Sequence, residues 1–262
     1  MQPNRVKAML RSGHAVTGPI MNEARSVSSV KMMAVAGHDF LFFDMEHAMF
    51  DWETMLNLVQ ASLMCDICPL IRVTDLAYPL VARALDSGAQ GIIIPRVETR
   101  GQVEDAVSFA KYPPVGRRGA GGDARYGYVR RPVRDAIQMA NDETLVVVQI
   151  ESVAGIANLA DIASVPGLDV VCLGPQDLSI SMNVHGDFAH PTFIEALREI
   201  VNLCRDQKVA TGMVEREPAA LRRWYEMGMQ FLCCNNDGNM IYQSAHRDVE
   251  ALRGFVKREP AA

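Results

Sequence analysis

Short apolar runs along this chain end in residues, most of them polar, whose types suit metal-assisted chemistry. These residues are Asp44, Glu46, His47, Arg72, Gln149, Glu151, Gly174, Pro175, Gln176, Asp177, Asn235, Asn236 and Asp237. Carboxylate oxygens are preferred ligands of Mg²⁺ and Mn²⁺, and a nearby arginine suits an anionic substrate. The set therefore predicts a metal-assisted site, provided that the fold brings the ends of these runs together.

Each of these residues also has a simpler structural interpretation. Asp177 and Glu151 could each cap a helix that follows them. His47 by itself is more often a surface or core histidine, and Arg72 could be only the ion-pair partner of Asp44. These interpretations are independent of one another. A common site, by contrast, accounts for all four residues together, namely Asp177, Glu151, His47 and Arg72.

The elements that must position these side chains are eight apolar runs of strand length. They cover residues 16–21, 40–46, 68–73, 91–97, 145–152, 169–178, 209–214 and 231–237. The runs are almost continuously apolar, as in parallel strands that are covered on both faces. Apolar residues at helical spacing lie between them, for example Leu56, Val59 and Leu63.

Alternating strands and helices predict βαβ units, and eight units in about 250 residues predict a (β/α)8 TIM barrel. We therefore expect a single domain over residues 1–262, with the polar run ends around one opening. An open doubly wound sheet is the alternative, but no G-x-G-x-x-G loop follows the first run. The long connection at 111–132 indicates a functional or disordered loop, and residues 240–258 predict a final helix.

Composition narrows the classes of function. The chain has 262 residues, with 26 Lys and Arg against 31 Asp and Glu, which gives a net charge of −5. This balance provides no basic surface for nucleic acid or for anionic lipid. No apolar run is long enough to span a membrane, and the N-terminus lacks a signal-peptide pattern. We expect a cytoplasmic protein that binds neither nucleic acid nor membrane.

Six motifs follow one another in order along residues 40–180. They are F-D-M-E-H (43–47), L-I-R-V around Arg72, L-D-S-G-A-Q-G-I-I-I-P-R-V-E-T (85–99), Y-P-P-V-G-R-R-G (112–119), V-Q-I-E-S (148–152) and L-G-P-Q-D-L-S (173–179). With these motifs the sequence resembles the HpcH/HpaI aldolases, the class II pyruvate aldolases of the citrate lyase β-subunit superfamily. The resemblance implies a barrel whose last helix, here 240–258, swaps onto a neighbouring subunit in homotrimers or homohexamers.

The resemblance also implies roles for individual residues. It assigns the metal to Glu151 and Asp177, and the carboxylate of pyruvate to Arg72. It makes His47 the catalytic histidine and Asp86 its supporting carboxylate, contributed in some members by an adjacent subunit.

Further residues fall on the substrate-binding positions of these enzymes. Gln149 matches a glutamine beside the metal, and the turn formed by Gly174, Pro175 and Gln176 would bind the substrate carboxylate. Arg118 matches the arginine of the P-P-x-G-x-R-G motif, and Asp44 matches a supporting acidic residue.

The implied reaction is the reversible aldol cleavage of 4-hydroxy-2-oxo acids to pyruvate, or a close 2-oxo acid, and an aldehyde. It would proceed through a metal-bound enolate with Mg²⁺ or Mn²⁺, and Co²⁺ also stays open. None of the five lysines lies at the carboxyl end of a strand run, which argues against a Schiff-base aldolase.

Other interpretations stay open at this point. An acyl-CoA lyase or an oxaloacetate decarboxylase of the same superfamily would use a similar site, and a non-catalytic barrel would lack metal binding. The sequence also leaves the aldehyde open between succinic semialdehyde, lactaldehyde, glyceraldehyde and tartronate semialdehyde.

Overall fold

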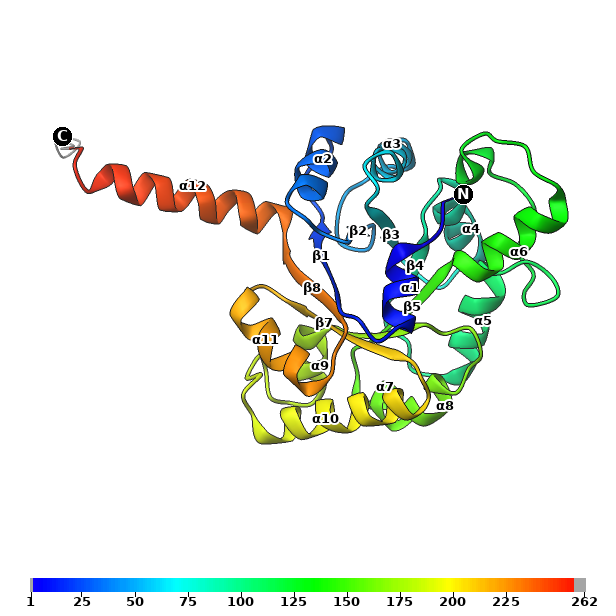
Figure 1. Cartoon of the computed structure of the whole chain (residues 1–262). Coiled ribbons are helices and arrows are strands. Elements are labelled where there is room, and N and C mark those ends of the chain that lie inside the picture. The colour runs from blue at the N-terminus through cyan, green and yellow to red at the C-terminus, as the bar shows by residue number, and fades with distance from the viewer. Residues whose placement is uncertain (1, 257–262) are drawn as a thin grey trace.

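The chain folds into a closed barrel of eight parallel strands surrounded by helices, as the computed structural model of residues 2–256 shows (Figure 1). The strands are Val16–Met21 (β1), Phe40–Asp44 (β2), Cys68–Arg72 (β3), Gly91–Ile94 (β4), Leu145–Ile150 (β5), Val170–Leu173 (β6), Ala210–Glu215 (β7) and Phe231–Asn236 (β8). Each predicted run matches one strand, although β7 ends one residue beyond its run, at Glu215. The barrel closes because β8 pairs with β1 in parallel, for example at Thr17 and Leu232, so the (β/α)8 prediction is confirmed and the open sheet is excluded.

Helices cover the outside of the barrel. They are Val27–Val35 (α2), Trp52–Met64 (α3), Tyr78–Asp86 (α4), Arg100–Ala110 (α5), Val133–Glu143 (α6), Val153–Ala157 (α7), Leu159–Ala163 (α8), Pro191–Asp206 (α10) and Pro218–Met227 (α11). Three more helices lie at the ends of the barrel: Arg5–Arg11 (α1) before β1, Pro175–Ser181 (α9) after β6 and Asp237–Arg253 (α12) after β8. None of the helices in residues 2–256 is long and apolar enough to cross a membrane.

The barrel interior is packed with side chains. Phe40 and Phe231 stack inside it with ring centroids 4.4 Å apart, and Val6 and Leu10 of α1 pack against this inner cluster. Gly18 permits this packing, since a Cβ there would lie 2.2 Å from the carbonyl oxygen of Phe40. Because α1 closes the amino-terminal end, the carboxyl ends of the strands form the open end.

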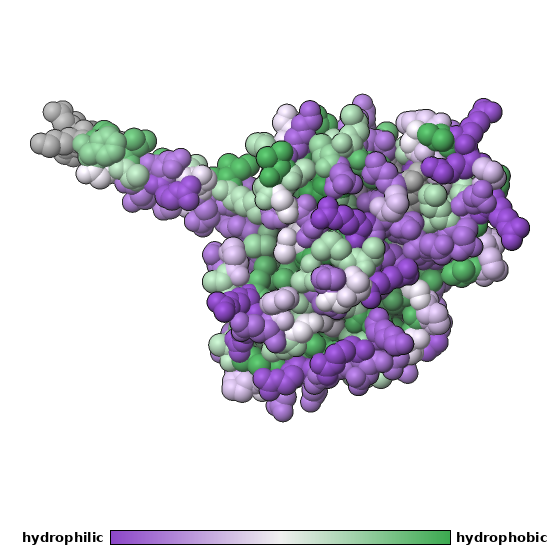
Figure 2. All heavy atoms as spheres, in the orientation of Figure 1, coloured by the Kyte–Doolittle hydropathy of each residue, from purple (hydrophilic) through white to green (hydrophobic). Residues whose placement is uncertain are grey.

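The predicted C-terminal helix is present as α12, with a different start. It begins at Asp237 rather than at 240, because Asn236 caps it by accepting a hydrogen bond from the backbone N–H of Asn239. It ends at Arg253, and residues 257 and 258 of the predicted segment lie outside the described residues. The helix projects away from the barrel, and Figure 2 shows apolar side chains toward its outer end.

Candidate active site

A cavity of about 340 Å³ lies at the carboxyl ends of the strands. It is lined by most of the residues that the sequence singles out, namely Asp44, His47, Arg72, Gln149, Glu151, Gly174, Pro175, Gln176, Asp177, Asn235 and Asn236. These positions are far apart in the chain and meet because all eight strands run in the same direction. The structure therefore supplies the common opening that the metal-site hypothesis requires.

Arg72 is the fixed positive charge at the base of this cavity. It is buried at the end of β3, directly opposite Asp44 on β2. Its Nε and Nη2 donate to the two carboxylate oxygens of Asp44 at 2.9 and 2.7 Å, and its Nη1 donates to Gln149 Oε1 at 3.1 Å. This two-pronged pairing fixes the plane of the guanidinium. The predicted ion pair with Asp44 thus exists within the site and orients Arg72 there.

Glu151 and Asp177 bring two carboxylates to the same cavity. Glu151 follows β5, and Asp177 lies in the first turn of α9. Burial raises the pKa of Glu151 to about 7, Arg72 opposes this rise, and Asp177 and Glu46 add to it. Gly174 leaves space for the carboxylate, since a Cβ there would lie 2.3 Å from Glu151 Oε1. A buried carboxylate beside a second, exposed one fits a divalent cation, which would stabilise the charged form of the buried group.

The side chains near Glu151 and Asp177 limit the number of metal ligands that the protein itself could provide. Within residues 2–256, no group of three or more His, Cys, Asp and Glu side chains could hold a metal ion. A cation at Glu151 and Asp177 would therefore take its other ligands from water and substrate, as Mg²⁺ commonly does.

His47 lies at the rim of the cavity. Its backbone N–H donates to Asp44 Oδ1 at 3.2 Å, which places the residue, while its side chain is 67% exposed. The side chain of the neighbouring Glu46 is only 7% exposed and forms ion pairs with Arg72 at 3.3 Å and with Arg96 at 2.9 Å. The sequence placed Glu46 at a strand end without giving it a role. The structure shows it as a further negative charge beside Arg72.

Two predicted site residues, Asp86 and Arg118, do not line this cavity. Asp86 is the last residue of α4, and its Oδ1 accepts from Nη2 of Arg118 at 2.5 Å. The guanidinium of Arg118 is buried and lies over the ring of Tyr112, 5.0 Å from its centroid. The helix runs back from the open end, so this pair lies away from His47 of the same subunit. Roles for Asp86 and Arg118 in catalysis would need a second subunit and stay predictions.

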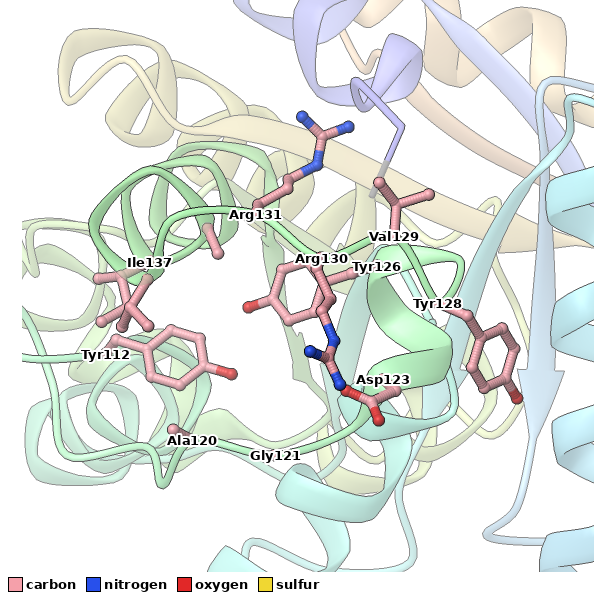
Figure 3. Close-up of a pocket in the computed structure, with 12 residues that line it drawn as sticks. Tyr112, Ala120, Gly121, Asp123, Tyr126, Tyr128, Val129, Arg130, Arg131 and Ile137 are labelled. Carbon is pink, nitrogen blue, oxygen red and sulfur yellow. The ribbon is translucent and has the colours of Figure 1, made fainter.

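The long connection at 111–132 encloses a second cavity, of about 500 Å³, against α6 (Figure 3). Figure 3 shows the hydroxyl groups of Tyr112 and Tyr126 directed into this space. A short 3-10 helix, Asp123–Tyr126 (η1), orders the middle of the connection. It is anchored by the buried Arg125, which donates to Ala140 O at 3.3 Å and to the Thr144 hydroxyl. This part of the connection is therefore ordered.

Comparisons with known proteins agree with the fold and identify the family. A family model described as HpcH/HpaI aldolase/citrate lyase matches residues 22–244. The hydroxypyruvate/pyruvate aldolase of Pseudomonas aeruginosa is 33% identical over 251 residues, which are 96% of this chain and 93% of that protein. The 2-dehydro-3,6-dideoxy-6-sulfogluconate aldolase of Pseudomonas putida is 33% identical over 259 residues, covering 97% of this chain and 99% of that one.

The same relation holds in three dimensions. The crystal structure of an HpcH/HpaI aldolase from Desulfitobacterium hafniense DCB-2 matches with a TM-score of 0.93 and 29% identity, covering 97% of this chain and 99% of that chain. The six sequence motifs, the closed barrel and these matches lead to one conclusion. This protein belongs to the HpcH/HpaI aldolase/citrate lyase family.

Proposed function

We propose that this protein is a divalent-metal-dependent aldolase that reversibly cleaves 4-hydroxy-2-oxo acids to pyruvate, or a close 2-oxo acid, and an aldehyde. The observation that carries the proposal is the carboxylate pair of Glu151 and Asp177 in one cavity with the buried Arg72. Membership of the family and the names of the two Pseudomonas relatives, both aldolases, support a carbon–carbon lyase.

Glu151 and Asp177 are the residues that would hold the cation, with Mg²⁺ or Mn²⁺ first and Co²⁺ as a further candidate. When bound, the cation supplies positive charge that stabilises the enolate of the 2-oxo acid. The chain alone does not balance the charge, because the four carboxylates of Asp44, Glu46, Glu151 and Asp177 are opposed by only two guanidinium groups, of Arg72 and Arg96.

Arg72 would bind the oxygens of the 2-oxo acid, and its geometry suits this role. Asp44 and Gln149 hold the guanidinium in place, so little side-chain freedom is lost when substrate binds. Gly174 and Gln176 offer backbone N–H groups at the start of α9, while Pro175 has no N–H and restricts the backbone of the turn.

His47 would move the proton of the C4 hydroxyl group. In cleavage this hydroxyl loses its proton and becomes the carbonyl oxygen of the aldehyde as the C3–C4 bond breaks. The electron pair of the broken bond passes to C3 and forms the enolate. Protonation of C3 then gives pyruvate. Imidazole can exchange protons near neutral pH, and the exposed position of His47 lets it act directly or through a water molecule.

We also propose that the protein is a homotrimer or homohexamer in which α12 packs onto a neighbouring subunit. The helix exposes Ile241, Val249 and Leu252, whose spacing places them on one face. Such a face is unfavourable in water unless it is covered. Light scattering should show an oligomer for the full chain and a smaller species for Leu252→Asp. An unchanged mass in an Ile241→Asp, Leu252→Asp double variant would contradict the exchange.

The experiment that tests the function is exchange of the pyruvate C3 protons in D₂O, followed by NMR without any aldehyde. We expect exchange with Mg²⁺ or Mn²⁺ that stops with EDTA, because the enolate half-reaction needs no acceptor. Undiminished exchange in EDTA would contradict the metal requirement. No exchange by folded protein in excess Mn²⁺ would contradict the pyruvate enolate and favour an acyl-CoA donor or a non-catalytic barrel.

A further inference from the structure

Arg96 lies two residues after the end of β4 and contacts two carboxylates of the active-site region. Its backbone N–H donates to Glu151 Oε2 at 3.3 Å, and its guanidinium pairs with Glu46 Oε1 at 2.9 Å. Nη2 of Arg96 also donates to the carbonyl oxygen of Thr74 at 3.2 Å, so the guanidinium is held in place although the side chain is 60% exposed. The residue does not line the cavity itself, and the proposed reaction gives it no role.

The backbone of Arg96 adopts a conformation that side chains other than glycine rarely take. Its φ is +53°, in the left-handed region. Glycine adopts this region without strain, and strained residues are concentrated at functional sites. In this conformation the N–H reaches Glu151 while the side chain reaches Glu46. An arginine here therefore contributes something that glycine could not, namely its positive charge beside Glu46.

The carboxylate of Glu46 lies between two guanidinium groups. Its Oε1 pairs with Arg96 at 2.9 Å and its Oε2 pairs with Nη1 of Arg72 at 3.3 Å. A carboxylate that is only 7% exposed needs a positive partner to stay charged. Since the shorter contact is with Arg96, this arginine compensates charge that Arg72 would otherwise have to compensate alone.

Arg72 has few N–H groups left for a substrate. Nε and one N–H of Nη2 donate to Asp44, and one N–H of Nη1 donates to Gln149 Oε1. A guanidinium carries five N–H groups, so one remains on Nη1 and one on Nη2. If Glu46 had no second cation beside it, its carboxylate would compete with an anionic substrate for these groups.

We propose that Arg96 is a positioning residue, which holds Glu46 and thereby keeps Arg72 available to the oxygens of the 2-oxo acid. The inference rests on the proposed function, in which Arg72 binds this substrate. Arg96 touches neither the substrate nor the cation and acts through Glu46. Loss of the Arg96 charge therefore weakens substrate binding, and loss of the Glu46 charge in the same protein restores it.

The first test is the rate of pyruvate C3 proton exchange against pyruvate concentration, with saturating Mn²⁺, in wild type and Arg96→Met. The variant should raise KM by about 10-fold, the effect of weakening one charge-assisted contact to the substrate. Its kcat should stay within about threefold of wild type, because the group that moves the proton is unchanged. Arg96→Lys keeps the charge and should keep KM within about threefold. An unchanged KM in Arg96→Met would overturn the proposal.

The second test identifies Glu46 as the connection between Arg96 and Arg72. In the double variant Glu46→Gln, Arg96→Met the neutral amide no longer competes for Arg72. KM should then return to within about threefold of the wild-type value, which is a strong coupling between the two substitutions. A double variant as impaired as Arg96→Met would show that Glu46 does not transmit the effect, and the proposal would be wrong.

The affinity for Mn²⁺ separates positioning from a general loss of structure. The N–H that contacts Glu151 belongs to the main chain, so Arg96→Met should bind Mn²⁺ no more weakly than wild type, as measured by electron paramagnetic resonance of free Mn²⁺. Parallel weakening of Mn²⁺ and pyruvate binding would contradict a positioning role. Arg100→Met is the matched control, because Arg100 pairs with Glu104 on α5 at 2.7 Å and does not line the cavity. It should leave KM and Mn²⁺ affinity unchanged.

Calorimetric titration of pyruvate into the Mn²⁺-loaded proteins distinguishes failure of this inference from failure of the proposed function, since it measures binding without turnover. If wild type exchanges protons and Arg96→Met binds pyruvate as tightly as wild type, only the role of Arg96 is wrong. If wild type exchanges no protons but Arg96→Met binds pyruvate about 10-fold more weakly, the proposed function is wrong and the role of Arg96 in binding stands.

Discussion

The two ends of the barrel bury opposite charges. At the carboxyl end, Arg72 is surrounded by carboxylates, and burial raises the pKa of Glu151 to about 7. At the amino end, Lys7 and Lys111 share the carbonyl oxygen of Thr144 at 2.6 and 2.7 Å, and Asp169 pairs with Lys7 at 2.8 Å. Burial, followed by the charge of Lys7, lowers the pKa of Lys111 to about 7.

The ends differ in how their charge is compensated. The lysines bind backbone carbonyls, since Lys111 also donates to Asn141 O at 2.5 Å, so their cluster is completed by the chain itself. The carboxylates of Glu151 and Asp177 line an open cavity and accept few hydrogen bonds from the chain. A buried charge excess thus indicates a ligand where it faces a cavity, and a structural role where the main chain satisfies it.

The largest effect is expected from removing a carboxylate at the open end. Asp177→Asn should reduce metal-dependent exchange of the pyruvate C3 protons by about 10³-fold or more, because cation binding contributes several kcal/mol. NMR in D₂O with Mn²⁺ measures the rate. Lys111→Met at the other end should change the rate of the folded protein by less than about twofold. Full activity in a metal-stripped Glu151→Gln, Asp177→Asn protein would remove both residues from the metal site.

A stability effect is expected at the amino end instead. Asp169→Asn leaves the buried Lys7 without its carboxylate partner and should lower the free energy of unfolding by about 3–5 kcal/mol. Urea unfolding at pH 7 measures this loss. Asp142→Asn is the control, because the carboxylate of Asp142 accepts only exposed hydrogen bonds, two from Gln138. A loss below about 1 kcal/mol for Asp169→Asn would show that the lysine cluster does not depend on its carboxylate.

The two ends should also give opposite pH dependence in metal-free protein. Between about pH 7 and 10.5 the unfolded chain binds a proton at Lys111 that the folded chain does not, so stability rises with pH. Between pH 4.5 and about 7 the folded chain keeps a proton on Glu151 that the unfolded chain has lost, so stability falls as pH rises. Urea unfolding in EDTA across this range measures both slopes.

Single substitutions assign each slope to its residue. Lys111→Met should remove the rise above pH 7, and Glu151→Gln should remove the fall below it. Slopes that match the wild type in both variants would mean that other groups produce them.

The smallest effect is expected at an exposed ion pair outside both clusters. Arg222 pairs with Glu226 one turn further along α11 at 2.9 Å, and both side chains are mostly exposed. Arg222→Ala should change the free energy of unfolding by no more than about 0.5 kcal/mol, because water screens such pairs. Thermal unfolding of Arg222→Ala, measured together with that of Asp169→Asn, provides the comparison. An equal loss of stability in both variants would contradict the view that burial determines how much an ion pair contributes to the free energy of unfolding.

The sequence by itself determined the elements and the order of the polar residues along them. Apolar runs of strand length are a local property of the chain, and each predicted run matches a strand, such as Val16–Met21 for the run 16–21. Glu151 and Asp177 could be singled out because a polar residue that ends a parallel strand reaches the open end of a barrel. The alternation of strands and helices was sufficient for this inference.

Only the tertiary structure decided how the charges combine. Arg72 meets Asp44 and Gln149 from 28 and 77 positions away, and no local pattern specifies such pairs. Spacing also could not show that Asp86 pairs with Arg118 away from His47, that the Glu46 side chain lies beside Arg72, or that Arg216 faces the cavity. The physical reason is that secondary structure follows from short-range periodicity, whereas burial and charge balance depend on residues that meet only when the barrel closes.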